Sequence, residues 1–401
     1  MSAGAVTVLE TTRRLYEAID PYGYESLLSD PERAVLGRLR EVLERDVRPL
    51  VNDHWDRAEF PHAIRGPLEA LDLMAPPELG VETSALYRGF RMLELARTDV
   101  SVAVFYGAQA TLFRNSVLLG GSPAQAAELD EGVRSWAIKG VFALTEPDHG
   151  SDVARGLATT ARRDGDGWVI SGAKRWIGGA EYADLITVVA RDEADGEVKA
   201  FLVDRHAPGV TVEQIPRKMA LRIVNNGHIT LDRVRVPEAR RLQRVNSFRD
   251  VNRLLRSMRA DVSWLATGAQ AGAYEAAVRY TLAREQFGRP IAGYQLVQDK
   301  LATMLGNLTA SLGMAVRLSQ LEDGGGYSDA DAALAKGWIA RRTRETVALA
   351  REVCGGNGIT LDTDVARFFA DAEAIYTFEG TNEINQLVVG RAITGLSAFV
   401  R

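Results

Sequence analysis

A single glutamate near the carboxyl end has the surroundings expected of a catalytic base. It lies in the segment Glu373-Ala374-Ile375-Tyr376-Thr377-Phe378-Glu379-Gly380-Thr381-Asn382-Glu383-Ile384-Asn385. Burial beside Tyr376 and Phe378 would raise the pKa of Glu379, whereas the amino end of a helix beginning near Thr381 would lower it. A carboxylate held between these effects can take a proton from a weak carbon acid. The alternative is that Glu379 merely caps a surface helix, and the segment by itself favours that plainer interpretation.

Four further segments could hold a planar, phosphorylated cofactor. In chain order they are Phe142-Ala143-Leu144-Thr145-Glu146-Pro147-Asp148-His149-Gly150-Ser151-Asp152, Lys174-Arg175-Trp176-Ile177-Gly178-Gly179-Ala180, Arg284-Glu285-Gln286-Phe287-Gly288-Arg289-Pro290 with Gln295 following, and Glu352-Val353-Cys354-Gly355-Gly356-Asn357-Gly358. The first offers hydroxyls and amides after a strand, and the second offers an indole beside glycines. The third offers a guanidinium that can bind phosphate, and the fourth offers a backbone without side chains that a diphosphate can approach. Each segment also has a plainer interpretation. The first could be a surface hairpin and the second could contain a core tryptophan. The third could be a helix end with solvated charges, and the fourth a glycine-rich helix stop.

Three stretches of different periodicity must position these residues. Apolar residues recur at helical spacing from about Pro31 to Arg134, and the helical period returns after Asn246. Between Ala137 and Pro237 short β-rich runs are separated by turn signals such as Asp164-Gly165-Asp166-Gly167. The sequence therefore predicts an α+β protein with an N-terminal helical domain (1–136), a middle antiparallel β-barrel (137–245) and a C-terminal helical bundle (246–401). Small residues are crowded into one segment of the bundle, which lets helices approach closely: Ala266, Gly268, Ala269, Ala271, Gly272 and Ala273.

Bulk composition limits the class of protein. The 401 residues are 46% hydrophobic and 25% charged, as expected for a globular chain of two or three packed units. A net charge of -5 argues against nucleic acid as a partner. The single cysteine, Cys354, cannot form an intrachain disulfide, and the five histidines show no metal-ligand spacing. We expect a cytoplasmic protein with no membrane span and no bound metal.

Taken together and in this order, the segments resemble the acyl-CoA dehydrogenase and acyl-CoA oxidase superfamily. The resemblance is strongest to the branch of glutaryl-CoA dehydrogenases and plant-type short-chain acyl-CoA oxidases, notably through Gly390-Arg391-Ala392-Ile393-Thr394-Gly395. It reverses the interpretation of Glu379, which takes the position of the family's catalytic base. It also implies bound FAD and a homotetramer in which a neighbouring subunit completes each site.

The resemblance implies a role for each matching residue. Phe142, Leu144, Thr145 and Ser151 would line the flavin, Trp176 would cover one face of its ring beside Ile177 and Gly178, and Thr381 and Phe399 would also contact the cofactor. Arg284, Phe287 and Gln295 would hold the diphosphate and adenine end, with Glu352, Gly355 and Gly356 supplied by the neighbour. The acyl-CoA substrate would meet Ser151, Arg259 and Gly380.

The resemblance implies α,β-dehydrogenation of an acyl-CoA to the trans-2-enoyl-CoA, which is a reaction of fatty acid metabolism. Glu379 would remove the α-proton while the β-carbon delivers hydride to flavin N5, and an electron-transferring flavoprotein would take the electrons. The Glu379 N–H and a flavin ribityl hydroxyl would stabilise the enolate. Three alternatives stay open: an oxygen-using acyl-CoA oxidase, a dehydrogenase of acyl groups on a carrier protein, and a non-catalytic acyl-thioester or flavin-binding scaffold.

Five positions depart from the family pattern: His149 and Glu352, which would either alter cofactor contacts or be harmless, and three that bear on the electron acceptor and the substrate. Gly178 replaces the threonine or serine whose hydroxyl reaches N5 in the dehydrogenases, which favours the oxidase alternative. Ala103 and Phe378 stand where glutaryl-CoA dehydrogenases have an arginine for the distal carboxylate and a tyrosine before the base. We therefore expect an uncharged acyl chain rather than a decarboxylated dicarboxyl substrate.

Overall fold

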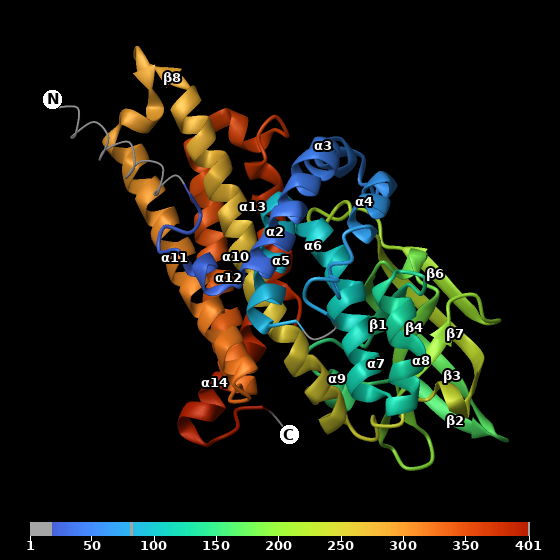
Figure 1. Cartoon of the computed structure of the whole chain (residues 1–401). Coiled ribbons are helices and arrows are strands. Elements are labelled where there is room, and N and C mark those ends of the chain that lie inside the picture. The colour runs from blue at the N-terminus through green and yellow to red at the C-terminus, as the bar shows by residue number, and fades with distance from the viewer. Residues whose placement is uncertain (1–17, 81–82, 400–401) are drawn as a thin grey trace.

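The computed structural model describes residues 18–80 and 83–399, with the β-rich part at one side of the molecule and the long helices at the other (Figure 1). The first part consists of short helices joined by tight turns. They are η1 (Tyr24–Leu27), α2 (Asp30–Val42), η2 (Leu43–Val47), α3 (Arg48–Arg57), η3 (His62–Ile64), α4 (Arg65–Glu69), α5 (Ala85–Thr98), α6 (Val100–Gly107), η4 (Ala108–Phe113), α7 (Arg114–Gly120) and α8 (Pro123–Arg134). Side-chain hydrogen bonds fix where several of these helices begin. At α2 the Ser29 hydroxyl accepts from the Glu32 N–H, and the Glu32 carboxylate accepts from the Ser29 N–H.

The middle part is a curled seven-stranded sheet. Its strands are β1 (Gly140–Ala143), β2 (Thr160–Asp164), β3 (Gly167–Gly178), β4 (Leu185–Asp192), β5 (Val198–Asp204), β6 (Val210–Gln214) and β7 (Asn226–Pro237), with the short helices α9 (Val153–Gly156), η5 (Ala180–Tyr182) and η6 (Glu238–Arg240). The strand order is β1-β4-β2-β3-β7-β6, and β5 also pairs with β4. The four expected strand runs lie in β3, β4, β5 and β7.

Two pairings of this sheet differ from the expected antiparallel pattern. β4 runs parallel to both β1 and β2, whereas the other pairs of neighbouring strands are antiparallel. A parallel pair needs a crossover rather than a hairpin, and the chain makes β2, β3 and η5 between β1 and β4. Turn signals reveal hairpins but not such long-range returns, so the sequence could not predict this arrangement.

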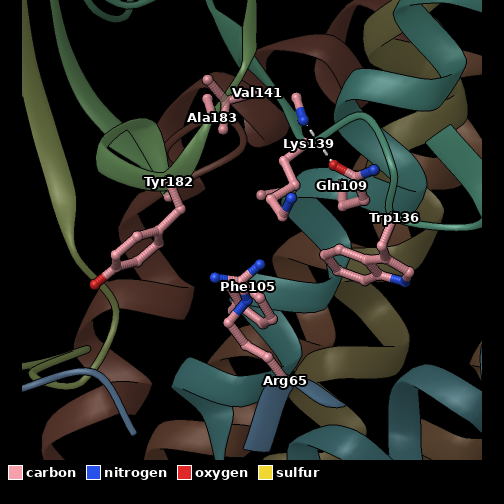
Figure 2. A pocket seen from close by; sticks show the side chains of 11 residues that line it. Arg65, Phe105, Gln109, Trp136, Lys139, Val141, Tyr182 and Ala183 are labelled. Atoms are coloured by element: carbon pink, nitrogen blue, oxygen red, sulfur yellow. Dashed lines mark hydrogen bonds between the residues drawn. The ribbon is translucent and has the colours of Figure 1, made fainter. Parts of the chain in front are cut away.

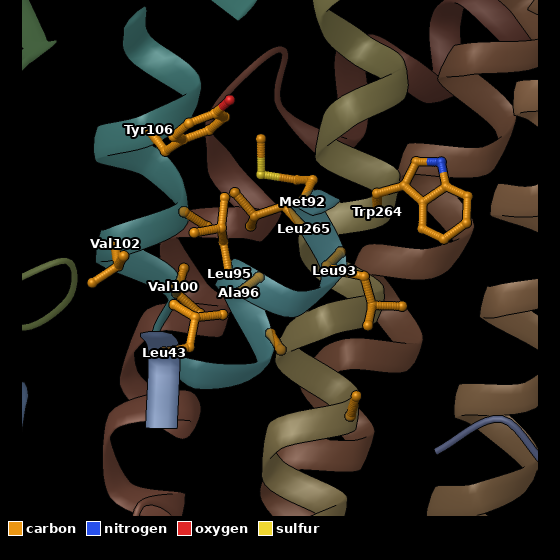
Figure 3. Packing of buried hydrophobic residues seen from close by; sticks show 14 of the residues in the cluster. Leu43, Met92, Leu93, Leu95, Ala96, Val100, Val102, Tyr106, Trp264 and Leu265 are labelled. Carbon is orange, nitrogen blue, oxygen red and sulfur yellow. The ribbon is translucent and has the colours of Figure 1, made fainter. Parts of the chain in front are cut away.

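The last part is a bundle of long helices. It comprises α10 (Phe248–Ala283), β8 (Glu285–Gln286), β9 (Arg289–Pro290), η7 (Ile291–Gly293), α11 (Gln295–Asp323), α12 (Asp329–Val353), η8 (Gly355–Ile359), α13 (Val365–Thr377) and α14 (Asn382–Thr394). Helix α10 packs against α5, as Figure 3 shows for Leu93, Ala96 and Leu265. A Cβ at Gly268 would lie 2.5 Å from the Leu93 carbonyl oxygen, so the small side chains do permit a close helix approach.

Three hydrophobic cores hold these parts together. The largest joins the first helices to the bundle, the second lies where α7, α8 and the start of α10 cover one face of the sheet, and the third fills the curl of the sheet itself. The predicted α+β fold of helices, sheet and helices is confirmed. We propose 1–136, 137–245 and 246–401 as its domain divisions. In the described part of the chain no helix is long and apolar enough to cross a membrane.

Candidate active site

Glu379 lies in the tight turn between α13 and α14. Its φ is 54° and that of Gly380 is 87°, so two consecutive left-handed residues reverse the chain. A non-glycine residue in this region is strained, and such strain collects at functional sites. The N-cap of α14 is Thr381, whose hydroxyl accepts from the Ile384 N–H at 3.3 Å. The plainer interpretation of Glu379 as a helix cap is therefore wrong.

The surroundings of Glu379 favour its protonated form. The side chain is partly exposed, and burial among the helices raises the pKa of its carboxyl. Arg259 on α10 and Lys336 on α12 lower the pKa, and Asp261 raises it. Burial outweighs the two cations, so the pKa of Glu379 lies above its ordinary value, as a base for a carbon acid requires.

Two side chains hold the turn that carries Glu379. Lys336 donates to the Tyr376 carbonyl at 3.0 Å and the Gly380 carbonyl at 2.7 Å, and Asn385 donates to the Gly380 carbonyl at 2.9 Å. Burial lowers the pKa of Lys336 to about 8, against the opposing charge of Glu379. Lys336 was not among the predicted site residues, although a lysine on the apolar stripe of a helix with Ala332 and Ile339 is a signal for such a role.

Trp176 presents its indole at the end of β3. The side chain is 53% exposed, its φ is 68°, and a register shift in the β3–β7 pairing falls between Lys174 and Ile177. The alternative of a core tryptophan is wrong. An exposed indole on a strained backbone offers a flat apolar surface for stacking.

The backbone two residues after Trp176 has open space beside it. Gly178 has no close neighbours, because a Cβ there would lie 3.7 Å from the Asn226 amide nitrogen and 3.8 Å from Val104 of α6. The other predicted residues of this region divide by burial: Phe142, Leu144 and Ile177 are buried, Thr145 is partly buried, and Ser151 is exposed in the turn before α9.

A buried ion pair joins β3 to the segment that follows β1. Lys174 and Glu146 are 2.9 Å apart with side chains 0% and 3% exposed. Lys174 also donates to the Leu144 carbonyl at 3.0 Å, and Glu146 accepts from the N–H groups of Ala158 and Thr159. The sequence analysis assigned neither residue a role. The signal was the period of two, which places Lys174 on the same buried face of β3 as Trp168 and Ile170.

A loop between β6 and β7 connects the Trp176 region to α13. Lys218 donates to the carbonyls of Leu221 and Val224 and to Asn226 Oδ1, each at 2.6 Å. Asn226 in turn donates to the Trp176 carbonyl at 3.3 Å, and the Leu221 N–H donates to Asp371 of α13 at 2.6 Å. Helix α13 leads directly into the Glu379 turn, so this loop links the Trp176 segment to the helix that precedes Glu379. No sequence pattern marked Lys218.

Six predicted cofactor residues lie elsewhere in the chain. They are Arg284, Phe287 and Gln295 around the β8–β9 hairpin, and Glu352, Gly355 and Gly356 at the end of α12. Lys300 and Glu352 pair at 3.4 Å and Asn357 donates to Tyr280 at 2.9 Å, which joins the two groups at one end of the bundle. Figure 1 places β8 and α14 at opposite ends of the bundle.

The length of α10 separates these residues from the base. Arg259 and Arg284 are 25 residues apart along or just beyond α10, which corresponds to about 37 Å at 1.5 Å per residue. Arg284, with Phe287 and Gln295 beyond it, therefore lies far along the bundle from Arg259. The glycine segment lies at the same end of the bundle, so a neighbour that supplied one of the two groups would supply the other. Phe399 follows α14 and is 41% exposed.

A small cavity near the start of β1 does not belong to this site. Figure 2 shows Phe105 and Trp136 on one side and Tyr182 on the other, with Arg65 and Lys139 pointing between them. Its volume is about 20 Å³, which is room for about one water molecule.

Comparison with known proteins identifies the family. Three family models match successive segments: the N-terminal domain of acyl-CoA dehydrogenase at residues 29–133, its middle domain at 141–234 and its C-terminal domain at 248–394. The mitochondrial short-chain specific acyl-CoA dehydrogenase of Bos taurus is 30% identical over 91% of this chain and 91% of its own length.

Solved structures give the same result. Glutaryl-CoA dehydrogenase from Mycobacterium smegmatis superimposes with a TM-score of 0.89 and 33% identity, covering 96% of this chain and 100% of that one. A second structure of a glutaryl-CoA dehydrogenase from that organism, in complex with FADH2, has a TM-score of 0.89 and 31% identity over 94% and 98% of the two chains. The chain therefore belongs to the acyl-CoA dehydrogenase family, whose members are FAD-dependent oxidoreductases acting on CH–CH groups.

Proposed function

We propose that this enzyme dehydrogenates an acyl-CoA between its α and β carbons, with Glu379 as the base that removes the α-proton. The observation that carries the proposal is the Glu379 turn: a strained, partly exposed carboxylate with a raised pKa, held by Lys336. A base whose pKa is raised toward neutrality binds the transferred proton better than an ordinary carboxylate does.

The groups of this chain suit FAD. Trp176 offers a half-exposed indole for the flavin ring, and open space surrounds Gly178 where a side chain would otherwise stand. Gly355 and Gly356 likewise have nothing within 4 Å of an added Cβ, and Arg284 is exposed for a diphosphate. When bound, FAD supplies the two-electron acceptor for the hydrogen that leaves the β-carbon.

The Glu379 backbone also contributes to the proposed chemistry. Its N–H donates to no group of the described residues, so it is available for a thioester oxygen on which negative charge develops. Arg259 lies near enough to lower the pKa of Glu379 and is held 4.0 Å from Asp329. We assign Arg259, Ser151 and Gly380 to the substrate, with an uncharged acyl chain.

Replacing Lys336 by methionine tests how the base is held. Lys336 lowers the pKa of Glu379, so Lys336→Met should raise that pKa further. The reaction needs the carboxylate, and its rate falls as pH drops through this pKa. We therefore expect the acid limb of the pH–rate profile to move to higher pH, measured by stopped-flow flavin reduction. Lys199→Met, whose ammonium pairs with the exposed Asp195 beside the sheet, should leave the limb in place.

We propose a homotetramer in which a neighbouring copy supplies Arg284, Phe287, Gln295, Glu352, Gly355 and Gly356 together. The support is their shared position at the end of the bundle opposite α14. We also propose a cytoplasmic location and a part in fatty acid metabolism, on the grounds of the single cysteine and the family.

The proposed electron acceptor is an electron-transferring flavoprotein, and Gly178 makes oxygen the alternative. A side chain fits at this position, because an added Cβ meets only ordinary contacts of 3.7–4.0 Å. Gly178→Ser would add a hydroxyl beside the flavin site. We expect it to slow reoxidation of the reduced enzyme by air several-fold, measured as hydrogen peroxide production. Gly178→Ala separates the effect of the hydroxyl from that of bulk, and equal slowing by alanine would refute a role for the hydrogen bond.

The function itself is tested by anaerobic bleaching of the flavin. Straight, branched and aromatic acyl-CoAs are added to the purified holoenzyme, and air is then admitted. Bleaching by at least one acyl-CoA supports the proposal. Bleaching only by acyl groups on a carrier protein would favour that substrate, rapid recolouring with peroxide would favour an oxidase, and no bleaching by any thioester would leave a non-catalytic scaffold.

A further inference from the structure

A second cavity, with a polar lining, lies beside η5. It is next to the Trp176 segment, because one of its lining residues, Asn226, donates to the Trp176 carbonyl. Its volume is about 120 Å³. It is lined by Glu181, Arg205, Val212, Gln214, Asn225, Asn226 and Gly227. A dry apolar cavity of about 150 Å³ can hold a benzene ring, so this space is large enough for a ligand of about five heavy atoms.

Arg205 is the unusual member of the lining. Its Nε is buried without a hydrogen-bond partner, and among the described residues its guanidinium makes no hydrogen bond or ion pair. Most other arginines around the sheet are paired, for example Arg163 with Glu238 and Arg235 with Asp164. A buried donor without an acceptor is costly, and a guanidinium is suited to two oxygens of one anion.

The remaining polar groups of the cavity are largely engaged with one another. Gln214 donates to Asn225 Oδ1 at 2.9 Å, and Asn225 donates to Glu181 Oε2 at 2.7 Å and to the Tyr182 hydroxyl. Glu181 is exposed, and its carboxylate also interacts with the Tyr182 hydroxyl, yet a carboxylate has four acceptor positions and can take a further hydrogen bond. The lining therefore offers one partly exposed cation without a partner among the described residues, Arg205, and one carboxylate with remaining acceptor capacity, Glu181.

We propose that this cavity binds a small oxyanion that carries its own hydrogen-bond donor, such as monohydrogen phosphate or a 2-hydroxycarboxylate. The anionic oxygens would meet Arg205, and the ligand's O–H would donate to Glu181. A simple carboxylate without a donor fits less well, because it would leave its charge facing the Glu181 carboxylate.

The site lies next to the machinery of the proposed reaction but is separate from it. The Gly179 N–H donates to the Asn225 carbonyl at 2.9 Å, and Asn226 donates to the Trp176 carbonyl at 3.3 Å. A ligand in the cavity would fix the positions of Asn225 and Asn226. Through their hydrogen bonds it would also fix the Trp176 turn. Ligand binding does not depend on dehydrogenase activity, so it can fail or succeed independently of the proposed function.

Calorimetric titration of the FAD-loaded enzyme with phosphate, glycolate and acetate tests the site. We expect phosphate or glycolate to bind more tightly than acetate, and Arg205→Gln to weaken the binding at least about tenfold, because a charge-assisted hydrogen bond is lost. Glu181→Gln should reduce or reverse the preference over acetate. Arg233→Gln, whose side chain is 82% exposed, serves as the control.

Each outcome has a defined meaning. Phosphate binding alone and glycolate binding alone both support the site and distinguish the two sources of the oxyanion. Arg205→Lys keeps the charge without the planar fork and guards against a folding defect, since it should bind more weakly than wild type but better than Arg205→Gln. The proposal is overturned if none of the three anions binds, or if binding is the same in wild type and Arg205→Gln.

Discussion

Glu379→Gln should keep its bound flavin and still bind acyl-CoA, yet lose flavin reduction by at least about a hundredfold and by as much as about ten-thousandfold. Glutamine preserves the size of the side chain and can keep the left-handed turn at φ 54°. It cannot take the α-proton. Stopped-flow absorbance at the flavin band, under anaerobic conditions with a thioester that bleaches the wild type, measures the loss.

Glu383→Gln is the matched control for this change. Glu383 lies four residues later, on the first turn of α14, and is exposed. It also contributes to the charge around Lys336, so the control reports any general electrostatic effect of removing a carboxylate from this region. We expect near-normal reduction. A Glu379→Gln enzyme that reduces its flavin at the wild-type rate would remove Glu379 from the mechanism.

Lys174→Met should destabilise the protein by about 3 kcal/mol and lower its affinity for FAD. Removing one partner of a buried ion pair leaves the other charge uncompensated, at a typical cost of about 3–5 kcal/mol. The lower end is expected here, because Glu146 keeps two backbone N–H donors. The Leu144 carbonyl loses its donor at the same time, which loosens the segment before Thr145. Urea unfolding and the FAD content after dialysis measure the two effects.

Lys199→Met provides the comparison for Lys174. Lys199 pairs with Asp195 at the same distance of 2.9 Å, but the Asp195 side chain is 48% exposed. An exposed partner can be solvated when its cation is removed, so the cost should stay below about 1 kcal/mol with FAD content unchanged. Equal losses in the two variants would show that the Lys174 pair has no special part in holding the cofactor segment.

Lys174, Lys218 and Lys336 act alike at three places in the site. Lys174 and Lys336 are buried and Lys218 is partly buried, and burial lowers the pKa of each to about 8. Each donates to main-chain carbonyls of a segment in or next to the candidate site. Together they organise the Leu144 turn, the loop behind Trp176 and the Glu379 turn. Lysine suits this task because one ammonium group can serve two or three acceptors that lie in different directions.

Local patterns in the sequence were sufficient for much of this protein. The segments around Trp168, Leu185, Ala200 and His228 were predicted as strands and lie in β3, β4, β5 and β7. The stripe of small residues near Gly268 was predicted to allow close helix packing, and it does. The order of motifs indicated the family. These features depend on residues near one another in the chain, where periodicity and turn chemistry act directly.

Other features depend on where distant segments meet, and only the tertiary structure decided them. The parallel pairing of β1 with β4 arises from a crossover, and the three lysines find their carbonyls through the folded path of the chain. The separation of Arg284 from Trp176 follows from the length and direction of α10. The sequence by itself indicated the elements, the family and Glu379 as the candidate base, because periodicity, turn signals and motifs are local. Only the tertiary structure decided which predicted residues lie together in one chain, because the long helix α10 carries Arg284 to the end of the bundle opposite α14.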